Sequence, residues 1–208
     1  MTFPFNMLIV GKTACGKTKY LLDMLEEEYK GFFEYIFLIC PTFEYNKTYR
    51  CWKYEKDNDY IVIPCDQDHV EYWLEYVTKN YKGTNSLIIL DDCASGKSVK
   101  NRTGVLVKLA YSARHYGFST IVITQQLTSI AKAYRENISK LVTFYNPNKK
   151  DMQEMFNDFL YISKEEEEKI ASTLKSKKYS RLEISLIHPY NHEIKWSVQL
   201  FNLFEDWI

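Results

Sequence analysis

Short apolar runs alternate with amphipathic segments along most of the chain, and the two kinds differ in period. The apolar runs, which predict buried strands, are residues 6–10, 35–39, 60–63, 87–90, 118–124 and 141–145. The segments with helical periodicity are residues 19–29, 67–80, 105–116 and 127–136. Strands that are apolar throughout and alternate with helices indicate a mostly parallel sheet covered by helices on both faces. The predicted fold is therefore a three-layer α/β fold.

The pattern changes after residue 148. Residues 150–159 and 164–174 predict two further helices. The acidic run at residues 165–168 falls near the start of the second helix, where the helix dipole favours negative charge. We interpret this run as a solvated helix face.

The end of the chain alternates apolar and polar positions. Residues 181–187 and 193–201 have this strand-like period, which predicts an antiparallel pair at one end of the sheet. No internal repeat or linker divides the chain, so we expect one domain over residues 1–208. Its core would cover about residues 5–160, and residues 161–208 would form a C-terminal antiparallel extension.

A phosphate-binding motif lies directly after the first predicted strand. The motif G-x-x-x-x-G-K-[ST] is matched by Gly11, Lys12, Thr13, Ala14, Cys15, Gly16, Lys17 and Thr18. A strand before this loop and a helix after it are the context that the motif requires. Its glycines let backbone N–H groups point at phosphates, Lys17 would reach the β- and γ-phosphates, and the Thr18 hydroxyl would bind Mg²⁺. The sequence therefore predicts that the chain binds ATP and Mg²⁺.

Two acidic residues follow the strand predicted at residues 87–90. Asp91 is placed to hold Mg²⁺ through water, and Asp92 is placed to accept a proton from an attacking water. The alternative is a pair of turn acids that only caps the strand. The strong phosphate-binding motif about seventy residues earlier favours the catalytic interpretation.

The next strand ends in Thr124-Gln125-Gln126, beside the other two motifs if the sheet is parallel. Gln125 could sense the γ-phosphate or the attacking water, while Thr124 could cap a following helix. Arg114 and Arg135 are the candidates for a cation that stabilises the transition state, in this site or in a neighbour's. For Arg135 we favour a surface salt bridge instead.

Charge and composition limit the kinds of partner. Lys+Arg and Asp+Glu both total 27 among 208 residues, so a nucleic-acid partner would have to meet local basic patches. One such patch is the basic segment at residues 95–102, with Lys97, Lys100 and Arg102, and the polar and aromatic segment at residues 47–59 is another. Both segments could instead be solvated connections. The segment at residues 95–102 has the better claim to a ligand, because it leaves the C-terminal edge of the predicted sheet, where ligands of such sheets bind.

Cysteine and histidine usage indicates no metal centre or disulfide framework. The five cysteines are odd in number and form no C-x-x-C pair. His188 and His192 are separated by Pro189, which breaks a helix, so we interpret them as loop residues and not as metal ligands. No signal peptide or long apolar run occurs in the sequence. We therefore expect a soluble protein without a membrane partner, made in a reducing compartment.

Three motifs of this chain together resemble those of a known protein family. The loop at residues 11–18, the acidic strand at residues 87–92 and the stretch ARHYGFSTIVITQQ at residues 113–126 are similar to the FtsK–HerA clade of P-loop ATPases. Within that clade, the chain most resembles the genome-packaging ATPases of large DNA viruses, virophages and polinton-like elements, including the poxvirus-type enzyme. The resemblance covers about residues 5–160.

The resemblance implies a fold and a function. It implies a RecA-like, additional-strand core and a hexameric or pentameric ring that moves double-stranded viral DNA, in a virion or a cytoplasmic viral factory, with a capsid or portal protein as a further partner. It assigns Asp91 to the metal, Asp92 and Gln125 to catalysis, and Arg114 to a role across subunits. The chain departs from cellular members in having Asp at position 92 where they have Glu, and it lacks a separate DNA-tracking domain.

Two other functions stay open at this point. The first is a P-loop kinase that phosphorylates a nucleoside or small molecule, although no arginine-bearing lid is evident in the sequence. The second is a nucleotide-gated assembly protein that hydrolyses ATP poorly, against which the acidic pair argues. We expect an ATPase that drives DNA translocation into a capsid.

Overall fold

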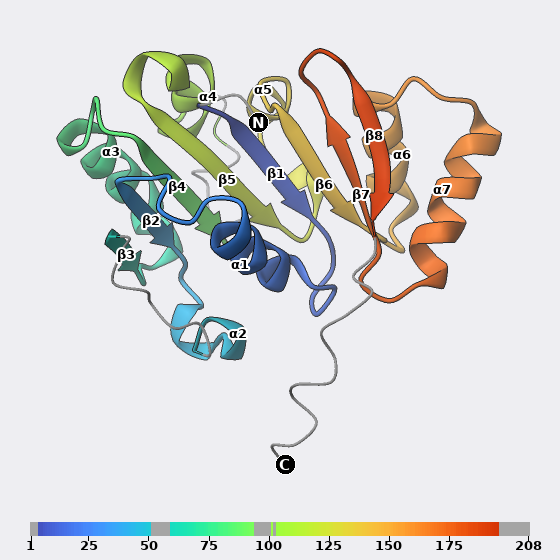
Figure 1. The fold of residues 1–208 in the computed structure, drawn as a ribbon, viewed down its shortest axis with the longest axis horizontal. Coiled ribbons are helices and arrows are strands. Elements are labelled where there is room, and N and C mark those ends of the chain that lie inside the picture. Colours follow the sequence, from blue (N-terminus) through green and yellow to red (C-terminus); the bar gives the residue numbers. More distant parts are fainter. Residues whose placement is uncertain (1–3, 51–58, 94–100, 102, 196–208) are drawn as a thin grey trace.

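A twisted, mostly parallel sheet forms the centre of the molecule (Figure 1). The computed structural model describes residues 4–50, 59–93, 101 and 103–195. Within them, the eight strands are β1 (Asn6–Val10), β2 (Tyr35–Ile39), β3 (Asp59–Ile63), β4 (Ser86–Asp91), β5 (Phe118–Thr124), β6 (Lys140–Phe144), β7 (Arg181–Ser185) and β8 (Asn191–Lys195). Their order is β3-β2-β4-β5-β1-β6-β7-β8.

The pairing of the strands confirms the predicted fold class. Strands β1 to β6 are parallel to one another, β7 is antiparallel to β6, and β8 is antiparallel to β7. Strand β5 lies between β1 and β4, as the resemblance implied. The sheet is thus of the additional-strand type, and its antiparallel extension comes from the C-terminal part of the chain.

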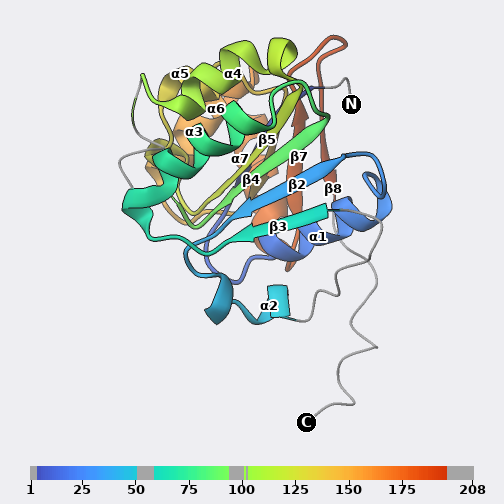
Figure 2. The same ribbon diagram turned by 90° about the vertical axis from the view of Figure 1, so that its left-hand side faces the viewer.

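Helices cover both faces of the sheet, as Figure 2 shows. The helix α1 (Lys17–Glu27) lies on one face. The other face is covered by α3 (Val70–Asn80), α4 (Val105–Tyr116), α5 (Lys132–Arg135), α6 (Lys149–Phe159) and α7 (Lys164–Ser176). The short helix α2 (Lys47–Arg50) lies at the edge of the sheet where the parallel strands end. Three 3-10 turns complete the description: η1 (Phe43–Tyr45), η2 (Gln67–His69) and η3 (Leu127–Ser129).

Two apolar cores, one on each face of the sheet, explain why the parallel strands are mostly apolar. In β1, Met7 and Ile9 belong to the core under α1, whereas Leu8 and Val10 belong to the core under α3 to α7. Side chains alternate between the faces of a strand, so a strand buried on both sides needs apolar residues throughout. None of the helices in the described ranges is long and apolar enough to cross a membrane.

The prediction of one helix over residues 127–136 is wrong. The segment forms η3 and the short helix α5, separated by extended backbone at Ile130 and Ala131. The Ser129 hydroxyl bonds the Thr124 hydroxyl at 2.8 Å and donates to the Gln126 carbonyl at 2.6 Å. Such local side-chain bonds offer the backbone an alternative to the helical pattern.

The C-terminal extension agrees with its predicted elements where it is described. Helix α7 begins with a capping box in which the Ser163 hydroxyl accepts from the Glu166 backbone N–H and the Glu166 carboxylate accepts from Ser163 N–H. The acidic run therefore starts a helix, as predicted. In the hairpin of β7 and β8, the buried Glu183 carboxylate bonds Lys140 at 2.7 Å and Arg181 at 2.8 Å. The second predicted strand extends to residue 201, and its part after residue 195 lies outside the described residues.

Candidate functional site: a phosphate-binding loop and two acids at one sheet edge

The backbone of the loop between β1 and α1 requires glycine at the two fixed glycine positions of the motif. A Cβ atom on Gly11 would lie 2.6 Å from Cys15 Sγ and 2.9 Å from Phe144 Cβ, closer than real Cβ atoms come. Gly16 has φ +104°, in the left-handed region that glycine occupies without strain, and Ala14 has φ +61°. The fixed glycines of the motif are therefore required by the fold of the loop.

Lys17 lies inside this loop. Its side chain is buried, and its ammonium group donates to the Gly11 carbonyl at 2.7 Å and to the Lys12 carbonyl at 2.9 Å. Thr18 follows in the first turn of α1, whose N-terminus carries a partial positive charge. The loop thus gathers a cation, a hydroxyl and a helix N-terminus, which together suit a phosphate chain.

The strand register brings the predicted motifs to one edge of the sheet. Val10 pairs with Thr124, and Asp91 pairs with Ile123, so β1, β4 and β5 end at nearly the same level. The Thr13 hydroxyl donates to Gln125 Oε1 at 3.2 Å, which links the loop to the predicted sensor. Gln125 is exposed at this edge.

Asp91 is a buried carboxylate with a phenolic partner. Its side chain is 2% exposed, and Oδ2 accepts a hydrogen bond of 2.7 Å from the Tyr49 hydroxyl of α2. Burial is the largest influence on this carboxyl and raises its pKa to about 6, whereas the Tyr49 hydrogen bond and the Lys17 charge act in the opposite direction. Asp91 therefore holds its proton more tightly than an exposed carboxyl does.

Asp92 is held in place on both its side chain and its backbone. The Thr42 hydroxyl donates to Asp92 Oδ2 at 2.8 Å, and the Gln67 amide donates to the Asp92 carbonyl at 2.6 Å. The backbone of Asp92 has φ +55°, which is uncommon for a residue with a side chain. The half-buried carboxylate is thereby turned out of the line of β4 and held close to Thr42.

The residues present fit a magnesium-bound nucleotide. Mg²⁺ in phosphate sites is held by one or two protein oxygens together with phosphates and waters. The Thr18 hydroxyl and the Asp91 carboxylate are protein oxygens of this kind, and the Lys17 charge acts on Asp91. The site could supply two ligands to the metal, with the loop backbone and Lys17 for the phosphates.

Of the two candidate arginines, the structure describes the side chain of Arg135 and not that of Arg114. Arg135 is 7% exposed and pairs with Glu154 and Asp158 of α6, each at 2.7 Å. The salt bridge that we favoured for Arg135 is therefore present, but it is partly buried and not on the surface. The alternative role as a cation that stabilises the transition state is corrected, because the guanidinium is paired with this chain's own acids. The backbone of Arg114 belongs to α4, and its side chain lies outside the described part of the structure. Its proposed role stays a prediction.

The sequence did not indicate three residues that donate hydrogen bonds to the acidic pair: Tyr49, Thr42 and Gln67. Residues 47–59 suggested only a solvated segment or a nucleic-acid patch, yet Tyr49 is 1% exposed. The position of Thr42 could have been predicted, because Thr42 comes shortly after β2. Ile39 of β2 pairs with Leu90 of β4, so Thr42 reaches the same edge of the sheet as the acids. Of the basic segment at residues 95–102, only Asn101 lies within the described residues, and it is exposed.

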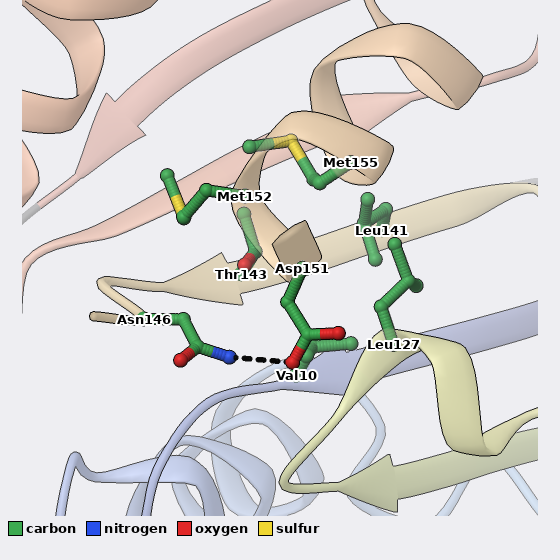
Figure 3. A pocket seen from close by; sticks show the side chains of 8 residues that line it. All are labelled: Val10, Leu127, Leu141, Thr143, Asn146, Asp151, Met152 and Met155. Carbon is green, nitrogen blue, oxygen red and sulfur yellow. Dashed lines mark hydrogen bonds between the residues drawn. The ribbon is translucent and has the colours of Figure 1, made fainter. Parts of the chain in front are cut away.

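A small cavity lies on the face of the sheet that is opposite α1 (Figure 3). It is lined by Val10, Leu127, Leu141, Thr143, Asn146, Asp151, Met152 and Met155. Its volume is about 10 Å³, which is room for about one water molecule. The buried Asp151 carboxylate accepts from the Asn146 amide at 3.0 Å and from the Thr128 hydroxyl at 3.2 Å. Asp151 is therefore satisfied by its neighbours, and the cavity is too small for a nucleotide.

The fold and the loop define the chain as a P-loop NTPase of the additional-strand class. The chain belongs to the Poxvirus A32 protein family, whose family model matches residues 1–189. The resemblance to poxvirus-type packaging ATPases is thereby confirmed.

Curated relatives come from poxviruses. The chain is 26% identical over 155 residues to the DNA packaging protein OPG160 of Variola virus, a match that covers 69% of this chain and 54% of the relative. The Vaccinia virus protein of the same name, from strain Copenhagen, matches to the same extent. The chain thus spans about half the length of the curated relatives it matches.

Solved structures share the fold. B204, the DNA-packaging ATPase from Sulfolobus turreted icosahedral virus, superposes with a TM-score of 0.70 at 18% identity, and the match covers 95% of this chain and 100% of B204. The genome-packaging NTPase B204 from Sulfolobus turreted icosahedral virus 2, in complex with ATP-γS, gives a TM-score of 0.68 at 19% identity over 94% of this chain and 98% of that protein. At these identities the likeness concerns the fold.

Proposed function

We propose that this chain is an ATPase that moves double-stranded viral DNA into a capsid. The observation that carries the proposal is the convergence of Lys17, Asp91 and Asp92 at one sheet edge, with Gln125 bonded to the loop. The printed names of the relatives, DNA packaging protein and DNA-packaging ATPase, support the same function. The FtsK–HerA resemblance adds the expectation that the enzyme acts as a homo-oligomeric ring.

The chain's own residues would perform the reaction in distinct roles. Lys17 and the loop backbone would bind the β- and γ-phosphates, and Thr18 and Asp91 would hold Mg²⁺. The metal neutralises charge on the phosphates when bound. Asp92 accepts the proton of the attacking water, and Gln125 orients that water or senses the γ-phosphate.

Asp92 needs a defined direction to act as a base. The Thr42 hydrogen bond at 2.8 Å and the Gln67 bond to its carbonyl at 2.6 Å both fix its position relative to the loop. Such second partners orient a catalytic carboxylate before the substrate arrives. Thr42 is in this account a positioning residue.

We assign the contact with DNA to the basic segment that follows β4 in the sequence. Its basic residues are Lys97, Lys100 and Arg102, which lie outside the described residues. Lysine and arginine neutralise DNA phosphates and release counterions. A capsid or portal protein at a viral factory would be the further partner of the ring.

The test is the rate of ATP hydrolysis with and without long duplex DNA, measured beside the Asp92→Asn variant to exclude a contaminating ATPase. The proposal predicts hydrolysis by the wild-type protein that long duplex DNA stimulates strongly. Transfer of phosphate to an added nucleoside, without stimulation by DNA, would contradict it and favour a kinase.

A further inference from the structure

The C-terminal extension returns to the phosphate-binding loop. Strand β7 starts at Arg181, which pairs with Phe144 at the end of β6. The turn before β7 therefore lies at the edge of the sheet where the loop also lies. Tyr179, in this turn, has the ring atom nearest to a Cβ built on Gly16, with Cδ1 at 3.1 Å; Phe144 Cε1 follows at 3.7 Å and Tyr179 Cε1 at 3.8 Å.

Tyr179 is held there in an unusual conformation. Its φ is +62°, which costs energy for a residue with a side chain and occurs preferentially at functional positions. Its side chain is only half-buried, unlike Tyr20 and Tyr134, which are enclosed in the protein. The Lys178 ammonium lies 4.8 Å from the centre of the Tyr179 ring. A half-buried aromatic ring thus lies beside the loop.

The direction of a bound triphosphate follows from the strand order. The residues proposed to act on the γ-phosphate follow β4 and β5, on one side of β1. The other end of the nucleotide, with its ribose and base, must then leave the loop on the opposite side of β1. Strands β6 and β7 lie on that side, and with them Phe144 and Tyr179.

We propose that Tyr179 is the platform on which the base of the nucleotide stacks. Every base has a flat π-face, and an aromatic side chain beside the phosphate loop offers a matching surface. Lys178 is exposed, so its contact with the ring can exchange with a stacked base. The inference rests on the proposed ATPase function, and it gives the C-terminal extension a part in binding the nucleotide.

The test compares a ligand that has a base with one that has none. Dissociation constants for ATP-γS and for inorganic tripolyphosphate, both with Mg²⁺, are measured for the wild-type protein and for Tyr179→Ala and Tyr179→Phe. Stacking predicts that Tyr179→Ala binds ATP-γS about 5- to 150-fold more weakly and tripolyphosphate unchanged. Tyr179→Phe keeps the ring and should bind both like the wild type. Tyr190→Ala, at an exposed tyrosine in the far turn of the hairpin, is the matched control and should also change nothing.

A second variant reports on stacking directly. The fluorescence of Tyr179→Trp, compared with that of the wild-type protein, should be quenched by ATP-γS and not by tripolyphosphate. Equal weakening of both ligands in Tyr179→Ala, or no weakening of either, would overturn the inference while leaving the ATPase proposal intact. A wild-type protein that binds neither ligand would instead refute the proposed function itself.

Discussion

The Tyr49 hydroxyl donates a 2.7 Å hydrogen bond to Oδ2 of Asp91, across 42 positions of the sequence. Both side chains are almost completely buried. A buried carboxylate is costly to ionise, and a hydrogen bond to its charged form recovers part of that cost. The helix α2 thus helps to decide the charge of the acid that is proposed to hold the metal.

We predict that Tyr49→Phe shifts the pH dependence of activity. The hydrogen bond from Tyr49 lowers the pKa of Asp91, so its removal should raise that pKa further above about 6. Because Asp91 must be ionised to hold Mg²⁺, the acid limb of the kcat/KM profile for ATP should move to higher pH. Phenylalanine keeps the ring that stacks on Phe43. The profile of Tyr45→Phe, at a tyrosine 81% exposed, should not move, and an unmoved limb in Tyr49→Phe would refute the role of this bond.

The stability of the protein without nucleotide should also depend on Asp91. Burial raises its pKa from 3.8 to about 6, so the folded state holds this proton more tightly than the unfolded state does. The stabilisation is full below the lower value and is lost as pH rises through about 6. Asp91→Asn should therefore be more stable than the wild type at pH 8, on the order of 2–3 kcal/mol.

Denaturant unfolding at several pH values checks this sign. The difference in the free energy of unfolding between Asp91→Asn and the wild type should shrink towards zero as pH falls from 8 to 4. Asparagine keeps an oxygen that can accept from Tyr49, so the hydrogen bond is retained. A difference that grows at low pH would show that Asp91 stabilises the fold as an anion.

Two substitutions separate nucleotide binding from hydrolysis. Lys17→Ala removes the buried cation of the loop, so both the affinity for ATP and its turnover should collapse. Asp92→Asn keeps the shape of the side chain and loses the base, so ATP should bind nearly normally and be hydrolysed very slowly. Equilibrium binding of ATP-γS and steady-state phosphate release measure the two properties. Wild-type turnover by Asp92→Asn would remove Asp92 from catalysis.

Much of the fold was predictable because each element carries its own periodicity. Residues 105–116 and 118–124 match α4 and β5, since amphipathic and continuously apolar patterns are local signals. The break within residues 127–136 was not predictable, because it depends on hydroxyl contacts between Thr124 and Ser129 that form only in the folded chain. These contacts override the helical periodicity of residues 127–136.

The motif residues of the candidate site could be predicted from the sequence. The residues that contact them from distant segments could not. Lys17 belongs to a specific motif, and Asp91 belongs to a weaker pattern that gains its meaning from that motif. Tyr49 and Tyr179 reach the site from distant segments with no motif of their own, through the short helix α2 and the turn before β7. Their roles need the three-dimensional arrangement of the sheet edge.

Substitution of Arg114 tests whether each ATP site is completed by an arginine from a neighbouring subunit. A guanidinium stabilises charge on the γ-phosphate, and the loss of such a group lowers hydrolysis by about 10³-fold or more. Arg114→Ala should therefore bind ATP and assemble, yet scarcely hydrolyse it. Mixed with Lys17→Ala protein, it should recover partial activity, because some interfaces then pair an intact loop with an intact arginine.

Two results would show that Arg114 does not act across subunits. One is mixed rings, verified by a label on each variant, that recover no hydrolysis. The other is full activity from a strictly monomeric wild-type species. Either result would place the complete site within one chain.

The central claim is that ATP hydrolysis by this chain moves double-stranded DNA, and displacement of a fluorescent third strand from a long linear duplex measures this movement most directly. The wild-type protein should release the third strand only when ATP and Mg²⁺ are present, at a rate that rises with the length of duplex available for loading. Asp92→Asn, which should bind ATP nearly normally, should release none. A wild-type protein that hydrolyses ATP while the third strand stays bound, as it does with Asp92→Asn, would contradict the account.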